Sequence, residues 1–197
     1  KIQRAAPGTK IGAKIALIEE IDRADLAVLF VEELKLLEIL EKKRPKVYDT
    51  SFRPPEDPTA METTKKVEME AATDIADHWA KNWIEDVIKA GAIDVFPDHT
   101  FRPDDKIIRS NYAMFLQNIL MVVTGDETIA TNYVGTPSKF PDVNASHYAF
   151  NAISLAVDRG FMKTEMMDGA FGISKTVSGA DALLVLRDFQ NELRITF

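Results

Sequence analysis

Two arginines occupy positions where the sequence predicts the start of a helix, and this placement suits them to binding an acid. Arg23 follows Ile21, and Arg109 follows Ile107, each by two residues and each ahead of an apolar helical pattern. The positive end of a helix dipole lies at this terminus, so a cation there does nothing for capping. A guanidinium beside free backbone amides would instead hold a carboxylate through paired hydrogen bonds. The alternative is that both arginines pair with aspartates of neighbouring segments and lock the fold.

Trp79 is a further candidate for contact with a ligand. A flat indole surface stacks well against the C–H groups of a sugar ring. Because Trp79 stands at the start of an apolar stripe, packing between helices is the interpretation that the sequence favours. Trp79 is therefore a minor site candidate.

The residues that support catalysis or metal binding elsewhere are poorly placed in this chain. Among the three histidines, His78 and His147 occupy equivalent positions of a repeat, which indicates a scaffolding role. No His-x-x-x-His zinc pattern, Gly-x-Ser-x-Gly motif or phosphate-binding glycine loop occurs. Asp98 and Asp104 share a loop but lack the spacing of calcium ligands, and the absence of cysteine excludes thiol chemistry. We predict no enzyme activity, no cofactor and no metal site.

Composition narrows the class of protein and its partners. The 197 residues are 46% hydrophobic and 28% charged, which is typical of a globular chain with a substantial core. The net charge of -7 argues against nucleic acid as a partner. No apolar run approaches the length of a transmembrane helix. The chain begins at Lys1 without a methionine, which indicates a piece of a longer protein.

The sequence repeats itself with a period of about 70 residues. Residues 70 positions apart carry matching types, as in Phe101 with Phe171, Ile107 with Val177, and Asn111 with Asp181. A period kept over several residue types means that one supersecondary unit was used more than once. Units of this size bury their apolar faces by stacking on one another.

The apolar spacing within each unit predicts helices joined by long loops. Asp22 is the expected N-cap of an amphipathic helix that ends at Pro45. A second apolar stripe ends near Gly91, and the next begins at Tyr112. The predicted fold class is all-α, with tandem helix-loop-helix repeats and at most short extended pieces.

An earlier, degenerate copy precedes the two clear ones. Ile21–Ala27 matches both Ile107–Ala113 and Val177–Leu183. The predicted division is therefore as follows: a degenerate or truncated repeat 1 at residues 1–43, a Pro-rich linker at 44–72, repeat 2 at 73–125, a connector at 126–139, and repeat 3 at 140–197.

Several spaced motifs together point to one family. They are Asp22-Arg23-Ala24-Asp25, Asp77-His78-Trp79-Ala80, Pro97-Asp98-His99-Thr100-Phe101-Arg102-Pro103, Phe140-Pro141-Asp142 and Asp168-Gly169-Ala170-Phe171. They resemble the motifs of the S-layer homology (SLH) domain family, over most of the chain apart from residues 44–72. The resemblance implies a pseudo-threefold assembly of three repeats that attaches proteins to the bacterial envelope without catalysis.

The resemblance also implies a ligand and the residues that contact it. Family members bind secondary cell-wall polysaccharide, often through its pyruvylated sugars, or peptidoglycan and associated polymer. Their grooves between repeats use the arginine of the helix-start motif, which is present here as Arg23 and Arg109 but is Gly179 in the third copy. The glutamate of that motif corresponds to Asp25 and Asn111, so these residues join the candidate ligand-binding set.

Three functions follow as hypotheses, all with an extracytoplasmic location in the bacterial cell envelope. The leading hypothesis is a non-catalytic anchor that binds cell-wall polysaccharide or peptidoglycan-associated polymer between SLH repeats. The alternative is a protein–protein docking module for other envelope proteins, in which the arginines are structural. The least favoured is the accessory end of a wall-active enzyme.

Overall fold

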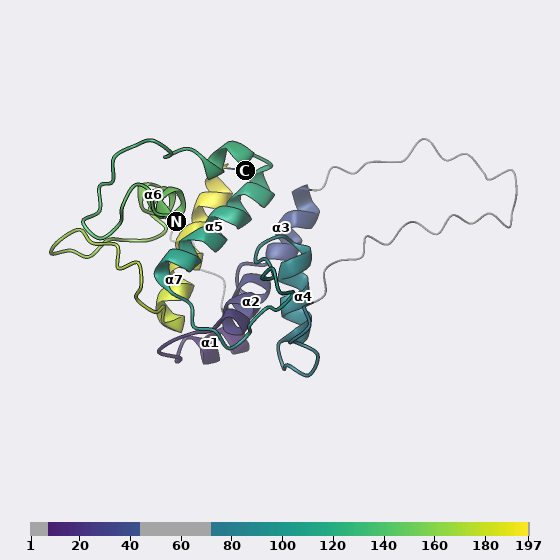
Figure 1. The fold of residues 1–197 in the computed structure, drawn as a ribbon. Coiled ribbons are helices and arrows are strands. Elements are labelled where there is room, and N and C mark those ends of the chain that lie inside the picture. Colours follow the sequence, from purple (N-terminus) through teal and green to yellow (C-terminus); the bar gives the residue numbers. More distant parts are fainter. Residues whose placement is uncertain (1–7, 44–71, 197) are drawn as a thin grey trace, which may run out of the picture.

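The computed structural model of the chain describes residues 8–43 and 72–196, and every regular element in these ranges is a helix (Figure 1). This confirms the all-α prediction. The predicted linker at 44–72 lies almost wholly outside the described residues. The helices are α1 (Lys10–Ile15), α2 (Arg23–Glu32), α3 (Leu36–Lys43), α4 (Lys81–Lys89), α5 (Arg109–Thr124), the short 3-10 helix η1 (Glu127–Ala130), α6 (Phe150–Asp158) and α7 (Gly179–Thr196).

The described residues form three units. They correspond to the degenerate first copy and to the two longer repeats of the sequence. We call residues 8–43 unit 1, residues 72–125 unit 2 and residues 140–196 unit 3. Units 2 and 3 each consist of a first helix (α4 or α6), a loop and a longer second helix (α5 or α7). In unit 1 the second helix is α2, and only the six-residue α1 precedes it.

The three units meet in a closed ring of backbone hydrogen bonds. Ile21 donates its N–H to the carbonyl of Val177, Val177 donates to Ile107, and Ile107 donates to Ile21, each over 3.0 Å. These residues hold the same position in the three sequence copies. The ring gives the units a pseudo-threefold relation, as the resemblance implied.

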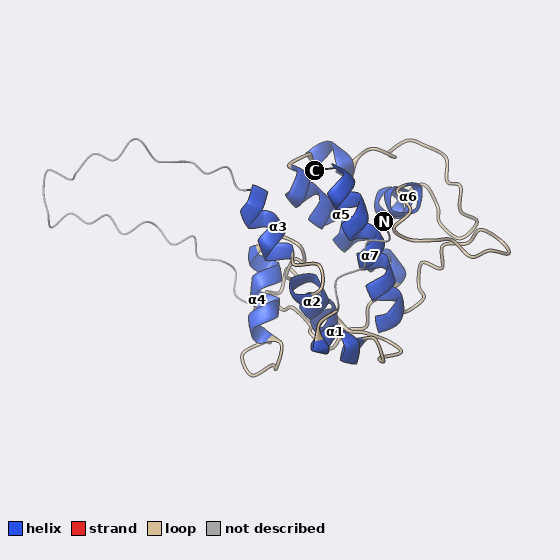
Figure 2. Cartoon of the chain, turned by 180° about the vertical axis from the view of Figure 1, so that it is seen from behind, coloured by secondary structure: helices blue, strands red, loops and turns tan. Residues whose placement is uncertain are grey.

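The second helices form the centre of the molecule, and the first helices lie outside them. Figures 1 and 2 show α4 and α6 on opposite sides of α2, α5 and α7. Helix α2 packs against α4, and α5 packs against α6, so the second helix of one unit carries the first helix of the next. Both of these helix contacts therefore lie between two units.

A buried aromatic pair ties the central helices together. The ring of Tyr112 on α5 stacks on Phe30 of α2 with 6.3 Å between centroids. Its hydroxyl donates to the carbonyl of Ala182 on α7 over 2.9 Å, so this side chain links α5 to both α2 and α7. Burial raises the pKa of Tyr112 well above its usual value, which keeps the phenol neutral. Burying such a ring contributes about 1.5–3 kcal/mol.

The single helix predicted from Asp22 to Pro45 is wrong, because the chain breaks between α2 and α3. Lys35 adopts a left-handed backbone conformation, with φ of 57°. Leu34 and Leu36 on either side of it are both 1% exposed. In a continuous helix these residues would point about 200° apart, so only one would reach the core. The break allows both to be buried.

Candidate functional site

The first backbone amides of α2 and α5 are occupied by the neighbouring unit. The backbone N–H of Arg23 donates to the carbonyl of Asp105 over 3.0 Å, and the backbone N–H of Arg109 donates to the carbonyl of Lys175 over 2.9 Å. The next amide of each helix also donates to the same loop. Free helix amides are therefore not available at these positions to a ligand, contrary to the sequence-based expectation. We call the contact of α2 with unit 2 seam 1–2, and the contact of α5 with unit 3 seam 2–3.

Arg23 is built into seam 1–2 as a buried clamp. Its Nε donates to the backbone carbonyl of Phe101 over 2.7 Å, and its Nη2 donates to the backbone carbonyl of Asp94 over 3.0 Å. The guanidinium lies over the rings of Phe96, Phe101 and Phe115 at 4.6–5.5 Å, and the residue is 6% exposed. Burial lowers the pKa of Arg23 to about 10, so the group stays charged at neutral pH.

Arg109 repeats the same anchor in seam 2–3 with much less cover. Its Nε donates to the backbone carbonyl of Phe171 over 2.8 Å, and its Nη2 donates to the backbone carbonyl of Lys163 over 2.6 Å. The guanidinium lies 4.7 Å from the Phe171 ring, and the residue is only half-buried. Burial lowers the pKa of Arg109, and the charges of Asp181 and other carboxylates oppose this shift. The Nη1 of Arg109 donates no hydrogen bond to any residue in the described ranges 8–43 and 72–196.

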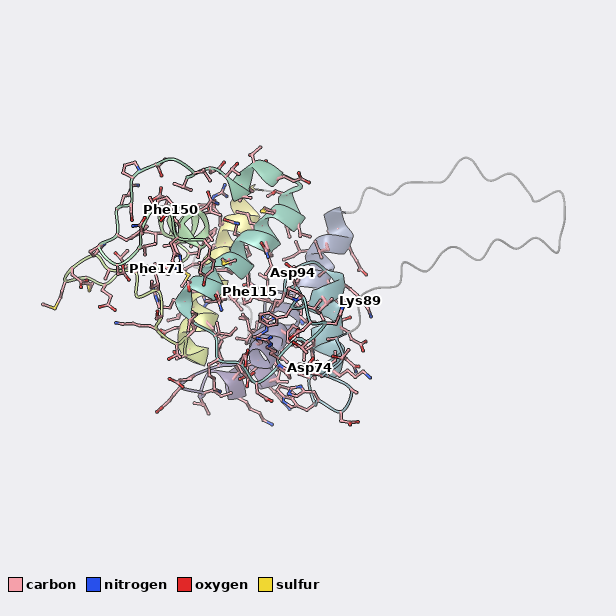
Figure 3. All side chains as sticks on the ribbon, in the orientation of Figure 1. Asp74, Lys89, Asp94, Phe115, Phe150 and Phe171 are labelled. Atoms are coloured by element: carbon pink, nitrogen blue, oxygen red, sulfur yellow. The ribbon has the colours of Figure 1, made fainter. Side chains whose placement is uncertain are left out.

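Within the described ranges, neither arginine pairs with an aspartate of a neighbouring unit, which was the alternative to ligand binding that the sequence left open. The ion pairs among the described residues include neither Arg23 nor Arg109. Both guanidiniums donate to backbone carbonyls of the next unit instead. Figure 3 places Asp94 and Phe115 of seam 1–2 to the right of Phe171 of seam 2–3, so the two seams are separate sites on the molecule.

Seam 1–2 carries an additional cation that the sequence did not single out. The guanidinium of Arg102 lies 4.1 Å from the ring of Phe96, whose ring also lies under Arg23. Arg102 is exposed and pairs with Asp98 at 2.8 Å. Its backbone φ of 55° explains why the equivalent residue in unit 3 is Gly172. The repeat does not mark this cation, because the equivalent position of the third copy holds Gly172.

Asp25 and Asn111 have the same place in sequence but different partners. Asp25 is 6% exposed and forms a capping box with Asp22, with N–H to carboxylate distances of 2.8 and 3.3 Å. Burial, together with the nearby charge of Asp22, raises the pKa of Asp25. In α5 the N-cap residue is Ile108, whose apolar side chain forms no capping hydrogen bond. The Oδ1 of Asn111 instead accepts from the hydroxyl of Tyr148 over 3.4 Å. Of the two, only Asn111 reaches an exposed side chain of the next unit.

The aromatic residues at the start of each first helix face solvent. Trp79 is 56% exposed and Tyr148, its equivalent in unit 3, is 68% exposed. The interpretation of Trp79 as a core wedge is therefore wrong, since it precedes α4 and its exposed ring lies tilted against the rings of His78 and Trp83. Tyr148 is the equivalent candidate at seam 2–3, which the sequence did not single out because a tyrosine replaces the tryptophan there.

The equivalent histidines serve the scaffold, as their repeated placement predicted. The Nδ1 of His78 accepts the N–H of Ala80, and the Nδ1 of His147 accepts the N–H of Ala149, each over 3.2 Å. These bonds set the chain that leads into α4 and α6. The imidazole rings also lie against the exposed rings of Trp79 and Tyr148, with 5.6 and 4.4 Å between the ring centroids.

The third seam, between unit 3 and unit 1, has no room for an arginine. The N–H of Gly179 donates to the carbonyl of Ile18 over 2.9 Å. A Cβ at Gly179 would lie 1.8 Å from the carbonyl oxygen of Ile15. The end of α1 therefore occupies the space into which a side chain at this position would extend.

Comparison with known sequences identifies the second and third units. Residues 73–113 and 139–183 match the sequence model of the S-layer homology domain. These two segments belong to the SLH family. The chain is also similar to Cell surface glycoprotein 1 of Acetivibrio thermocellus, with 38% identity over 80 residues. That similarity covers 41% of this chain and 3% of the length of the glycoprotein.

The match to the SLH domain model indicates the general role and location of these two segments. SLH domains are non-catalytic modules that anchor proteins to the cell wall, and the similarity to a cell surface glycoprotein agrees with this role. Both findings indicate an extracytoplasmic location in the cell envelope. None of the helices in the described ranges is long and apolar enough to cross a membrane.

Proposed function

We propose that this chain anchors its protein to the bacterial envelope by binding an acidic cell-wall polymer at seam 2–3. The observation that carries the proposal is the half-buried guanidinium of Arg109. Two of its nitrogens are fixed by carbonyls of unit 3, which orients the group, while Nη1 has no partner among the described residues. A preorganised cation of this kind binds a carboxylate with little loss of side-chain entropy.

Seam 2–3 also offers groups that suit a sugar. Asn111 supplies an amide that hydrogen bonds to hydroxyl groups, and it already contacts Tyr148 at the seam. The exposed ring of Tyr148 gives a surface for a pyranose face. We propose Arg109, Asn111 and Tyr148 as the ligand contacts of seam 2–3, for a secondary cell-wall polysaccharide or peptidoglycan-associated polymer that carries carboxylates.

Seam 1–2 is proposed as a weaker site with a different arrangement. Arg23 is too deeply buried to contact a polymer directly, and Asp25 is engaged in its capping box. Trp79 remains as an exposed stacking surface. The ligand contact proposed for this seam is therefore Trp79, with Arg23 and Asp25 acting through the structure of the seam.

Unit 1 is proposed to be a degenerate SLH repeat. Its helix α2 starts on unit 2 with the same amide and guanidinium bonds that α5 makes to unit 3. Ile21 also takes its place in the central ring of hydrogen bonds. On this proposal, unit 1 is the third member of the threefold set.

A pull-down on purified wall polymer tests the proposal. Arg109→Ala should lower binding at least about tenfold while the protein stays folded, because the oriented cation is lost. Arg187→Ala, which removes an exposed arginine of α7, is the matched control and should bind as wild type. Polymer binding that survives Arg109→Ala and Tyr148→Ala together would refute seam 2–3 as the site.

The docking alternative is favoured by one observation, namely that both arginines already serve the contacts between units. In that case Arg109→Ala would lower the melting temperature without changing polymer binding. The same pull-down with a melting curve for each variant therefore separates the two functions.

A further inference from the structure

We propose that Asp74 and Asp142 are positioning residues, which hold the two seam arginines in place through a single shared peptide group. The inference deepens the proposed function, because it concerns the same seams. Among the described residues, neither aspartate forms a hydrogen bond or an ion pair with Arg23 or Arg109. Each acts from the opposite face of the loop that the arginine binds.

In unit 2 the carboxylate of Asp74 grips the loop from behind. Its Oδ1 accepts the N–H of Phe101 over 2.8 Å, and its Oδ2 accepts the N–H of Arg102 over 2.7 Å. The carbonyl of Phe101 accepts Nε of Arg23 from unit 1. Asp74 and Arg23 thus bind the same short piece of backbone from two sides.

Unit 3 repeats this arrangement with one more bond. The Oδ1 of Asp142 accepts the N–H of Phe171 over 2.8 Å, and its Oδ2 accepts those of Gly172 over 2.6 Å and Ile173 over 3.3 Å. The carbonyl of Phe171 accepts Nε of Arg109 over 2.8 Å. The recurrence in two units of different loop sequence shows that the arrangement is built in.

Peptide geometry explains how the aspartate reaches the arginine. The carbonyl of Phe171 and the N–H of Gly172 belong to one planar trans peptide, in which these two groups point in opposite directions. Holding the N–H on Asp142 therefore aims the carbonyl at Arg109. The carbonyl of Phe101 and the N–H of Arg102 have the same relation between Asp74 and Arg23.

The charges at the two ends reinforce the same orientation. A carboxylate at the N–H end and a guanidinium at the carbonyl end both favour the direction of the peptide dipole, so each bond strengthens the other. Burial lowers the pKa of Arg109, and the charges of Asp181, Glu165 and Asp142 oppose this shift, with Asp142 the weakest of the three. Without the aspartate, the peptide is free to rotate and the guanidinium loses its fixed direction.

Arginine side-chain NMR on the full chain tests the inference without any ligand. The Nε–H signals of Arg23 and Arg109 are assigned from their loss in Arg23→Lys and Arg109→Lys. In Asp142→Asn an amide NH2 faces the backbone N–H groups, so hydrogen exchange at Arg109 Nε–H should speed up by about tenfold while Arg23 Nε–H stays unchanged. Asp74→Asn should produce the reverse pattern. An unchanged Arg109 signal in folded Asp142→Asn, or equal acceleration of both arginines, would overturn the inference.

A measurement on the wild-type chain covers the case in which a variant does not fold. If one opening releases the shared peptide, Gly172 N–H and Arg109 Nε–H should have protection factors that agree within about threefold. Exchange of Arg109 Nε–H that is far faster than that of Gly172 N–H contradicts the coupling. Should the NMR effect appear while Asp142→Asn still binds wall polymer fully, the positioning role stands and the proposed polymer site at seam 2–3 is refuted.

Discussion

Seam 1–2 and seam 2–3 use the same arginine anchor, yet one is sealed and the other is open. Arg23 lies among three phenylalanine rings, whereas Arg109 lies over one. Asp25 closes the helix start of the first seam, while Asn111 reaches out to Tyr148 in the second. The comparison teaches that one repeated joint can bury its guanidinium or leave it half-exposed, depending on the side chains that surround it.

A few loop and helix positions account for this difference. The ring of Phe96 is replaced by Met166 in unit 3, and Met166 is fully exposed rather than stacked on the arginine. Arg102 is replaced by Gly172, so the added cation is lost. Each arginine–ring contact contributes about 0.5–2 kcal/mol, and the sealed seam has more of them.

The largest effect is expected when the sealed arginine is removed. Arg23→Ala leaves the carbonyls of Phe101 and Asp94 without their donor and opens a cavity among the aromatic rings, which should cost about 3 kcal/mol of unfolding free energy. Arg109→Ala should cost about 1 kcal/mol, because water replaces its donors. Urea unfolding of both variants measures the difference. Equal losses would show that the two seams are equally packed.

The third seam allows a test of a position where no arginine fits. Gly179→Ala places a Cβ against the carbonyl oxygen of Ile15, so α1 must shift, and we expect a loss of about 2 kcal/mol. Gly8→Ala is the control, since its Cβ would make only ordinary contact with Glu33 at 3.5 Å. Thermal unfolding of the two variants compares them. If Gly179→Ala melts like Gly8→Ala, the close approach of α1 is not needed for the seam.

The parts of the fold that the sequence predicted are those set by local patterns. Asp22 begins its helix because its side chain accepts the backbone N–H of Asp25, three residues away. Gly91 ends the first helix of unit 2 with φ of 69° because only a glycine adopts this conformation at little cost. The arginines were found because the repeat places them at equivalent helix starts.

The remaining features depend on contacts between distant segments, which no local pattern records. The carbonyls that bind Arg23 come from a loop more than 70 residues away. Gly179 was interpreted as a lost cation, whereas the approach of α1 explains it. The break at Lys35 carries no glycine or proline signal, because burial of its two leucine neighbours drives it. The ligand contacts themselves stay predictions.

Exchanging one side chain between the seams should exchange part of their character. Met166→Phe is expected to place a ring over Arg109, raise the unfolding free energy by about 0.5 kcal/mol and weaken polymer binding severalfold by covering the guanidinium. Phe96→Met should destabilise seam 1–2 by a similar amount. Met167→Phe, at a neighbouring exposed position, is the control and should change neither property. Stronger polymer binding by Met166→Phe would contradict our account of the open seam.

The smallest effect concerns the pH dependence that Asp142 brings to seam 2–3. Burial alone would raise the pKa of Asp142, but the N–H donors of Phe171, Gly172 and Ile173 outweigh burial and lower it. A carboxyl with a depressed pKa stabilises the fold above its unfolded value, about 4, and this contribution is lost as the pH falls through the folded value. Unfolding free energies of wild type and Asp142→Asn should therefore differ at pH 6 and converge toward pH 2, while Asp188→Asn, at an exposed position of α7, follows wild type throughout. A difference in unfolding free energy between wild type and Asp142→Asn that stays the same at low pH would mean that the Asp142 side chain acts by its shape alone. The charge of Asp142 would then make no contribution to the stability of seam 2–3.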